Sequence, residues 1–233
     1  MLFTRLTLFF TALFVLSGCG TLNAARPMDA GQHRVGVTFG GPFTTALGPP
    51  IPVPNLIVEG RSGIEPIAEK PVDLNYGLNI TGIAFGQLGL HGGASIHLVE
   101  NDGWRPGISV TERLHIYNNY FDSTKPLETR MFWGLNELDV TASWALGNHM
   151  VYIGGSDIVD LRDPELLVAP FVGVDLQPEG RRVGFQFESR LLGANFSPEI
   201  WDVTWLTVGE TPGYGLVSIT ASASWALGGE DAR

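Results

Sequence analysis

The sequence is poor in charged residues and contains almost no lysine. Only 16% of its 233 residues are charged, against about a quarter in ordinary soluble domains. Lys70 and Lys125 are the only lysines, so the chain lacks the charged coat expected of a soluble protein of this size. The net charge of -10 and the lack of a basic run argue against nucleic-acid binding. A hydrophobic share of 44% argues against disorder.

Cysteine is almost absent as well, which removes disulfides and paired-thiol redox chemistry from consideration. The single Cys19 follows an N-terminal stretch with Arg5 near its start and an apolar run from Leu6 to Leu16. A helix that spans a membrane needs about 20 apolar residues, so this run is too short for one. It predicts an export signal that takes no part in the fold.

Leu16, Ser17 and Gly18 directly precede Cys19. This motif resembles the lipobox of bacterial lipoproteins, in which a peptidase cuts before the cysteine and the thiol carries a diacylglyceryl group. The resemblance implies a signal peptide over 1–18, a mature N-terminus at Cys19 that is acylated on sulfur and nitrogen, and the lipoprotein-processing machinery as a partner. Gly20 stands where an aspartate would imply inner-membrane retention, so the implied location is the outer membrane. The alternative is an ordinary cleaved signal with an incidental cysteine.

After the signal, a single domain is expected. Residues 19–31 have no periodicity and are interpreted as a lipidated tether, 32–228 as the folded domain and 229–233 as a C-terminal tail. No composition shift marks a second domain.

Apolar and polar residues alternate through this domain, which indicates β-strands with one face of each kind. The alternation has no fault from Val72 to Thr81. It recurs over 88–98, 108–116, 138–146, 183–190 and 217–225, and weaker strands fit around 35–39, 56–60, 150–155 and 168–176. The sequence therefore predicts an all-β protein of eight to ten strands, with ten favoured.

The polar face of these strands distinguishes a soluble sandwich from a membrane barrel. It carries glycine, serine, threonine, asparagine and histidine rather than the lysine and glutamate of a surface in water. Small polar residues suit the wet interior of a small barrel whose apolar side chains meet lipid. Ten residues at about 3.3 Å each, tilted by about 40°, also match the roughly 25 Å apolar band of such barrels. The predicted fold is an antiparallel up-and-down transmembrane β-barrel.

The connections and the tryptophans support this prediction. Long links are expected at 40–55, 118–130, 157–166 and 192–212, and mostly brief ones at 61–71, 100–105, 147–148 and 177–180. All six tryptophans fall in turns, loops or strand ends, where interfacial girdles place them. In these respects the chain resembles small outer-membrane β-barrel proteins of Gram-negative bacteria, which implies the lipid bilayer and the barrel-assembly machinery as partners. Three features depart from the pattern: Trp225 is not the final residue, Glu112 falls on the lipid face, and Pro170 interrupts a strand.

The candidates for chemistry lie on the predicted lumen side. Ser95 and His97 share one face of one strand and, with a carboxylate, resemble the machinery of outer-membrane lipid-A deacylases. The other polar lumen residues expected are His91, Arg113, His115, Glu137, Glu188 and Arg190. Filling of the lumen by polar side chains is favoured over catalysis, and no metal site or cofactor is expected.

The function that follows is a lipid-anchored outer-membrane barrel with a structural or surface-interaction role, and with at most a narrow path for solutes. Its extracellular partner is not identified by the sequence. The first alternative is an acyl-ester hydrolase that uses Ser95 and His97. The second is a periplasmic, lipid-tethered β-sandwich or lipocalin-like ligand carrier.

Overall fold

The computed structural model describes residues 22–45, 48–84, 86–119, 132–162, 164–197, 205–209 and 213–227. The elements are β1 (His33–Thr44), β2 (Ile51–Pro52), β3 (Asn55–Ile67), β4 (Lys70–Asn79), α2 (Ile80–Ala84), β5 (Gln87–Val99), β6 (Gly107–Asn119), β7 (Phe132–Leu146), β8 (His149–Asp160), β9 (Leu166–Leu176), β10 (Val183–Leu192) and β11 (Leu216–Leu227). The predicted signal 1–18 and tail 229–233 lie outside the described residues.

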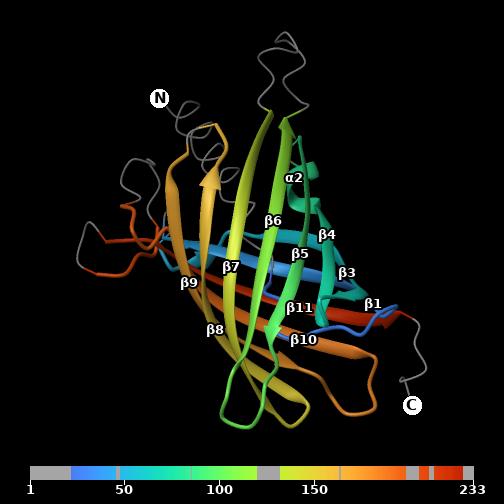
Figure 1. The fold of residues 1–233 in the computed structure, drawn as a ribbon. Coiled ribbons are helices and arrows are strands. Elements are labelled where there is room, and N and C mark those ends of the chain that lie inside the picture. The colour runs from blue at the N-terminus through green and yellow to red at the C-terminus, as the bar shows by residue number, and fades with distance from the viewer. Residues whose placement is uncertain are drawn as a thin grey trace, which may run out of the picture.

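Ten of these strands form a closed antiparallel barrel, as the alternation predicts (Figure 1). Each strand pairs with its neighbour in the chain, apart from the two-residue β2, which pairs only with the end of β1. The ring closes where β11 pairs antiparallel with β1 over ten residue pairs, from His33 opposite Leu227 to Pro42 opposite Ser218. A closed ring leaves no free sheet edge, and the chain is therefore not a two-sheet sandwich.

The side chains are distributed in the opposite way to those of a soluble protein. Val140, Val172 and Ile219 point outward and expose 50%, 53% and 48% of their surface. Asp73 and Ser95 point inward and are completely buried. This is the arrangement that the strand pattern predicts, with apolar residues on the outer face and polar residues in the lumen.

The two ends of the barrel differ. One end, here named the turn end, carries the connections at 68–69, 100–106, 147–148 and 177–182. The other, the loop end, carries the connections at 45–54, 80–86, 120–131, 161–165 and 193–215. The longest connections thus lie at the loop end, but the link expected to be long at 157–166 is reduced to 161–165, which is shorter than the turn-end connection at 100–106. No helix in the described ranges is long and apolar enough to cross a membrane.

Two details differ from the sequence-based expectations. The connection after β4 contains the short helix α2, so Ile80 and Thr81, which were assigned to a strand, are helical. Pro170 does lie inside β9, but β9 pairs with β10 only from Phe171 onward, and Pro170 faces Gly155 of β8 alone. The absence of an amide hydrogen at Pro170 therefore leaves the β9–β10 pairing intact.

Candidate functional site

The middle of the lumen is filled by a buried cluster of charged side chains. Glu137 lies at its centre, with one carboxylate oxygen 2.9 Å from Arg113 Nη1 and 3.0 Å from His115 Nε2. Its other oxygen accepts a hydrogen bond from Arg190. Arg190 also contacts Glu188 Oε1 at 3.0 Å. All five side chains are almost completely buried, so each charge depends on its partners rather than on water.

Further groups extend this cluster toward the barrel wall. Arg113 Nη1 lies 2.7 Å from Asp139 Oδ2, and the Tyr152 hydroxyl donates to Glu188 Oε2 at 3.1 Å. Strand alternation places all of these side chains in the lumen, but the sequence does not reveal which of them pair. Two guanidinium groups and three carboxylates thus form a single charged cluster that occupies the lumen at mid-height.

The N-terminal segment enters the lumen instead of lying outside it. Leu22, Asn23, Ala24, Ala25 and Met28 are all buried. Asn23 donates from Nδ2 to Glu188 Oε2 at 2.8 Å, and its main-chain oxygen accepts a hydrogen bond from Gln186 at 2.8 Å. The segment interpreted as a tether is therefore, over its described part, a lumen plug: we use this name for residues 22–29.

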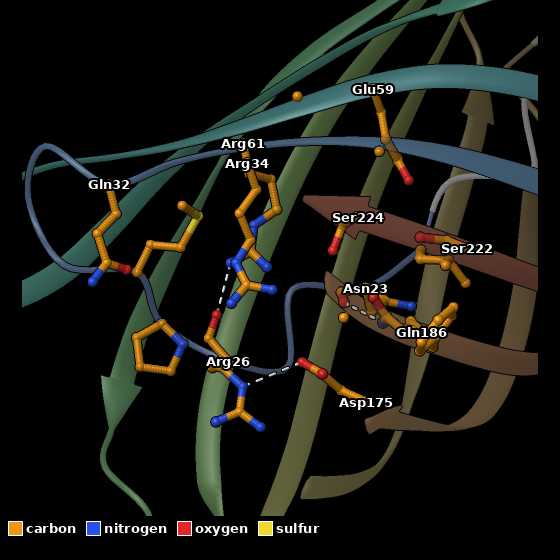
Figure 2. A pocket seen from close by; sticks show the side chains of 17 residues that line it. Asn23, Arg26, Gln32, Arg34, Glu59, Arg61, Asp175, Gln186, Ser222 and Ser224 are labelled. Carbon is orange, nitrogen blue, oxygen red and sulfur yellow. Dashed lines mark hydrogen bonds and ion pairs between the residues drawn. The ribbon is translucent and has the colours of Figure 1, made fainter. Parts of the chain in front are cut away.

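The plug leaves a small cavity near the turn end (Figure 2). Its volume of about 80 Å³ accommodates a few water molecules rather than an organic solute. Arg26 from the plug lies 3.4 Å from Asp175, and the Arg26 carbonyl accepts a hydrogen bond from Arg61 at 2.7 Å. Arg34 donates to Gln177 at 2.8 Å. Arg61 and Asp175 thus hold the plug against the wall, whereas Arg34 and Gln177 bond to each other within the wall.

At the loop end, the lumen is occupied by apolar side chains. Tyr117 and Trp133 stack with their ring centroids 4.2 Å apart, and Trp205 packs into the same cluster from the loop before β11. The other buried members are Val53, Leu135, Ile158, Ala169, Leu192 and Leu216. The expected interfacial girdle is therefore wrong for Trp133 and Trp205, which face inward. Their position at strand ends does not distinguish a lipid-facing ring from a lumen-facing one.

The other tryptophans fit the girdle better. Trp104 is 95% exposed at the turn end, and its carbonyl accepts a hydrogen bond from the Trp144 indole at 3.2 Å. Trp225 is on the outer face and 44% exposed. Trp201 lies outside the described residues.

Ser95 and His97 do not form the pair that the esterase alternative requires. Ser95 Oγ accepts hydrogen bonds from Thr111 at 2.8 Å and from Asn75 at 3.3 Å. His97 Nε2 instead contacts Asp73 at 3.0 Å. Strand alternation places both side chains on the lumen face, but their partners are on neighbouring strands. In this arrangement, Ser95 is completely buried and has no histidine to take its proton.

His91 is the remaining histidine candidate, and its neighbour in the lumen is His115. The rings of His91 and His115 lie 5.4 Å apart, whereas His97 belongs to the Asp73 contact described above. Within the described ranges, no three histidine, cysteine or acidic side chains converge as metal ligands.

The link expected at 157–166 contains four acidic residues, which the structure divides between a strand and a connection. Asp157 and Asp160 belong to β8, so the loop begins later than the sequence suggests. Asp160 pairs with Arg162 at 3.3 Å. Asp163 lies outside the described residues, as do Leu16, Ser17, Gly18 and Cys19.

The fold and the lumen together define the class: a closed ten-stranded antiparallel barrel with an apolar exterior, a lumen that is polar at mid-height and toward the turn end, and an apolar cluster at the loop end. No family model matches the chain, and no curated protein shows significant similarity to its sequence. Functional interpretation therefore depends on the geometry of the barrel itself.

Proposed function

We propose that this protein is an outer-membrane β-barrel of the Gram-negative cell envelope, anchored by lipid at Cys19, with a structural or surface-interaction role. The observation that carries the proposal is the inverted distribution of polarity. A barrel in water would not surround a buried cluster of arginines and carboxylates with a ring of exposed valine, leucine and phenylalanine.

A lipid environment gives this exterior a physical reason. The outer face exposes large apolar side chains on nearly every strand, among them Phe39, Leu90, Val140, Phe185 and Ile219. In acyl chains these side chains are solvated at no cost, whereas in water they would promote aggregation. The exposed Trp225 and the Trp104–Trp144 contact at the turn end suit the boundary between acyl chains and headgroups.

The filled lumen favours a structural or surface role over transport through a wide pore. The charged cluster occupies mid-height, the plug occupies the turn-end half, and the apolar cluster with Trp205 occupies the loop end. The longest connections, at 45–54, 120–131 and 193–215, lie at the loop end and so offer the surface on which a partner can bind. A narrow solute path requires movement of at least the plug.

Heat-modifiable migration of the detergent-solubilised protein tests the membrane barrel. We expect unheated protein to migrate differently from boiled protein in SDS, because membrane barrels resist SDS until heated. The same chain without residues 1–19 should need detergent to stay in solution. Identical migration before and after boiling, together with solubility without detergent, would contradict the proposal.

Metabolic labelling with palmitate tests the anchor separately. The wild-type protein should incorporate label, and a Cys19→Ser variant should not. Topology is tested with an epitope tag inserted between Leu161 and Glu165 or, as the matched control, between Gly147 and Asn148. Intact cells should bind the antibody only when the tag lies in the first position, at the loop end.

A further inference from the structure

The lumen wall holds the plug by its main chain as well as by the side chains of Asn23 and Arg26. Four wall side chains donate to carbonyl oxygens of the plug: Arg113 to Leu22 at 3.2 Å, Gln186 to Asn23 at 2.8 Å, Ser109 to Ala24 at 3.2 Å and Arg61 to Arg26 at 2.7 Å. Asp73 accepts a hydrogen bond from the amide of Met28 at 3.1 Å. These donors come from strands on different sides of the barrel, so the wall surrounds the segment. These five contacts use main-chain groups that every polypeptide has.

One wall residue is a glycine where the plug passes closest. A Cβ built on Gly63 would lie 2.2 Å from the Asp29 carbonyl oxygen and 3.1 Å from Met28 Cβ. Two main-chain hydrogen bonds, between Gly31 and Gly63 and between Gly63 and Gln32, fix the segment at this point. Gly63 therefore provides the space in which the plug lies, and any side chain there conflicts with it.

When Leu22 lies in the lumen, acyl chains attached to Cys19 cannot lie in the bilayer. Leu22 is buried in the lumen, and its carbonyl accepts a hydrogen bond from the guanidinium of Arg113, whose Cα lies six residues, or about 15 Å along the axis, from either end of β6. The three residues from Cys19 to Leu22 extend over at most about 10 Å. Acyl chains attached to Cys19 would thus begin inside a closed wall lined by charged and hydroxyl groups.

The state with the acyl chains in the bilayer and the state with the plug in the lumen also differ greatly in free energy. Several acyl chains gain far more from burial in a bilayer than the plug gains from a few hydrogen bonds that water can replace. Lipidation of Cys19 therefore favours the state in which the acyl chains are in the membrane, even though the plug contacts are lost.

We propose that the lumen wall is a binding site for a polypeptide main chain, which the plug (residues 22–29) occupies when Cys19 is free of lipid and leaves when Cys19 is lipidated. The inference rests on the lipid anchor of the proposed function. In the anchored protein, Arg113, Gln186, Ser109 and Asp73 face an open half-lumen that is available to water, to small solutes or to another extended segment.

Thiol cross-linking reports whether the plug is in place. The reporter is the pair Ala24→Cys and Ser109→Cys, chosen because Ser109 Oγ lies 3.2 Å from the Ala24 carbonyl oxygen. Dibromobimane becomes fluorescent when it bridges two nearby thiols. The control pair is Ser95→Cys with Thr111→Cys, which are directly opposite on β5 and β6 and do not involve the plug.

Both pairs are compared in two forms of the full barrel. One form keeps residues 1–19 and is lipidated; in the other, a signal peptide of the non-lipidated type replaces these residues. The control pair should cross-link equally in both forms. The reporter pair should cross-link in the form without lipid and lose at least tenfold in yield in the lipidated form.

Each outcome has a defined meaning. Equal reporter cross-linking in a chain shown by mass spectrometry to carry lipid overturns this inference and leaves the anchor standing. A chain with no lipid on Cys19 overturns both the anchor and the inference. A reporter pair that fails to cross-link in either form, while the control pair reacts, shows that the wall is not a plug site and also overturns the inference.

A second variant tests the plug site without lipid. Gly63→Val should abolish reporter cross-linking in the non-lipidated form, because a side chain at this position occupies the space in which the plug lies. The matched control is Gly92→Val, since Gly92 is exposed on the outer face and has nothing within 4 Å of its Cβ position. Unchanged cross-linking in Gly63→Val would contradict the assignment of the site.

Discussion

Asn23 donates a hydrogen bond to Glu188 at 2.8 Å, although the two residues are 165 positions apart in the chain. Glu188 in turn contacts Arg190 and accepts a hydrogen bond from Tyr152. The N-terminal segment is therefore connected directly to the charged cluster at mid-height. Any process that moves this segment also changes the partners of a buried carboxylate.

The buried charged cluster should be sensitive to loss of one cation. Arg190→Gln leaves Glu137 and Glu188 short of a partner in a position without water, so the free energy of unfolding should fall by about 3–5 kcal/mol. Urea unfolding followed by tryptophan fluorescence measures this loss. The control, Arg181→Gln, removes an exposed charge at the turn end and should change stability by less than about 0.5 kcal/mol. Equal effects of both substitutions would contradict the buried network.

Glu112 tests whether lipid covers the outer face. It points outward from the middle of β6 and accepts a hydrogen bond from Asn136 at 3.2 Å. In a bilayer, Glu112→Leu should raise the free energy of unfolding by about 1 kcal/mol, because a carboxylate on the lipid face is unfavourable. Folding titrations in lipid vesicles measure the change. The reverse substitution Val140→Glu should lower stability, and a stabilising effect of Val140→Glu would show that this face meets water.

The strands could be predicted from the sequence because alternation is local and repeats along each element. Val140 and Asp139 differ in environment simply because successive side chains point to opposite faces. Alternation cannot show how far a lumen is filled. The plug at 22–29 has no periodicity, and its contacts with Glu188, Ser109 and Asp73 depend on the closed ring. Nothing in the sequence marks Gly63 among 30 glycines.

The errors at the loop end also arise because alternation does not show how the lumen is filled. Trp133 and Trp205 stand at positions where a sequence reader expects a membrane girdle, yet both are buried in the apolar cluster. Whether a strand-end tryptophan faces lipid or the lumen depends on one residue of register. Sequence also cannot decide the partners of Ser95 and His97, because a shared face does not distinguish a partner on the same strand from partners across the sheet, such as Thr111 and Asp73.

The apolar cluster at the loop end should hold the connection before β11 in place. Trp205→Ala removes a large buried side chain, so we expect a loss of about 3–5 kcal/mol if the loop end unfolds with the barrel. Limited proteolysis should also cut within 193–215 faster than in the wild type. Trp104→Ala is the matched control, because Trp104 is 95% exposed and in contact only at the turn end. Identical digestion of both variants would contradict the role of the cluster.

Ser95 should not act as a nucleophile. Its hydroxyl is completely buried and bonded to Asn75 and Thr111, and His97 is held by Asp73 rather than by Ser95. Ser95→Ala should therefore leave the rate of acyl release from lipid A unchanged from that of the wild type, with both at background. Stability should fall by about 1 kcal/mol, because the partner donors lose an acceptor. The matched variant Ser189→Ala, on the exposed outer face, should change neither quantity. Wild-type acyl release that disappears only in Ser95→Ala would establish the esterase instead, and would require Ser95 and His97 to adopt partners that this structure does not give them.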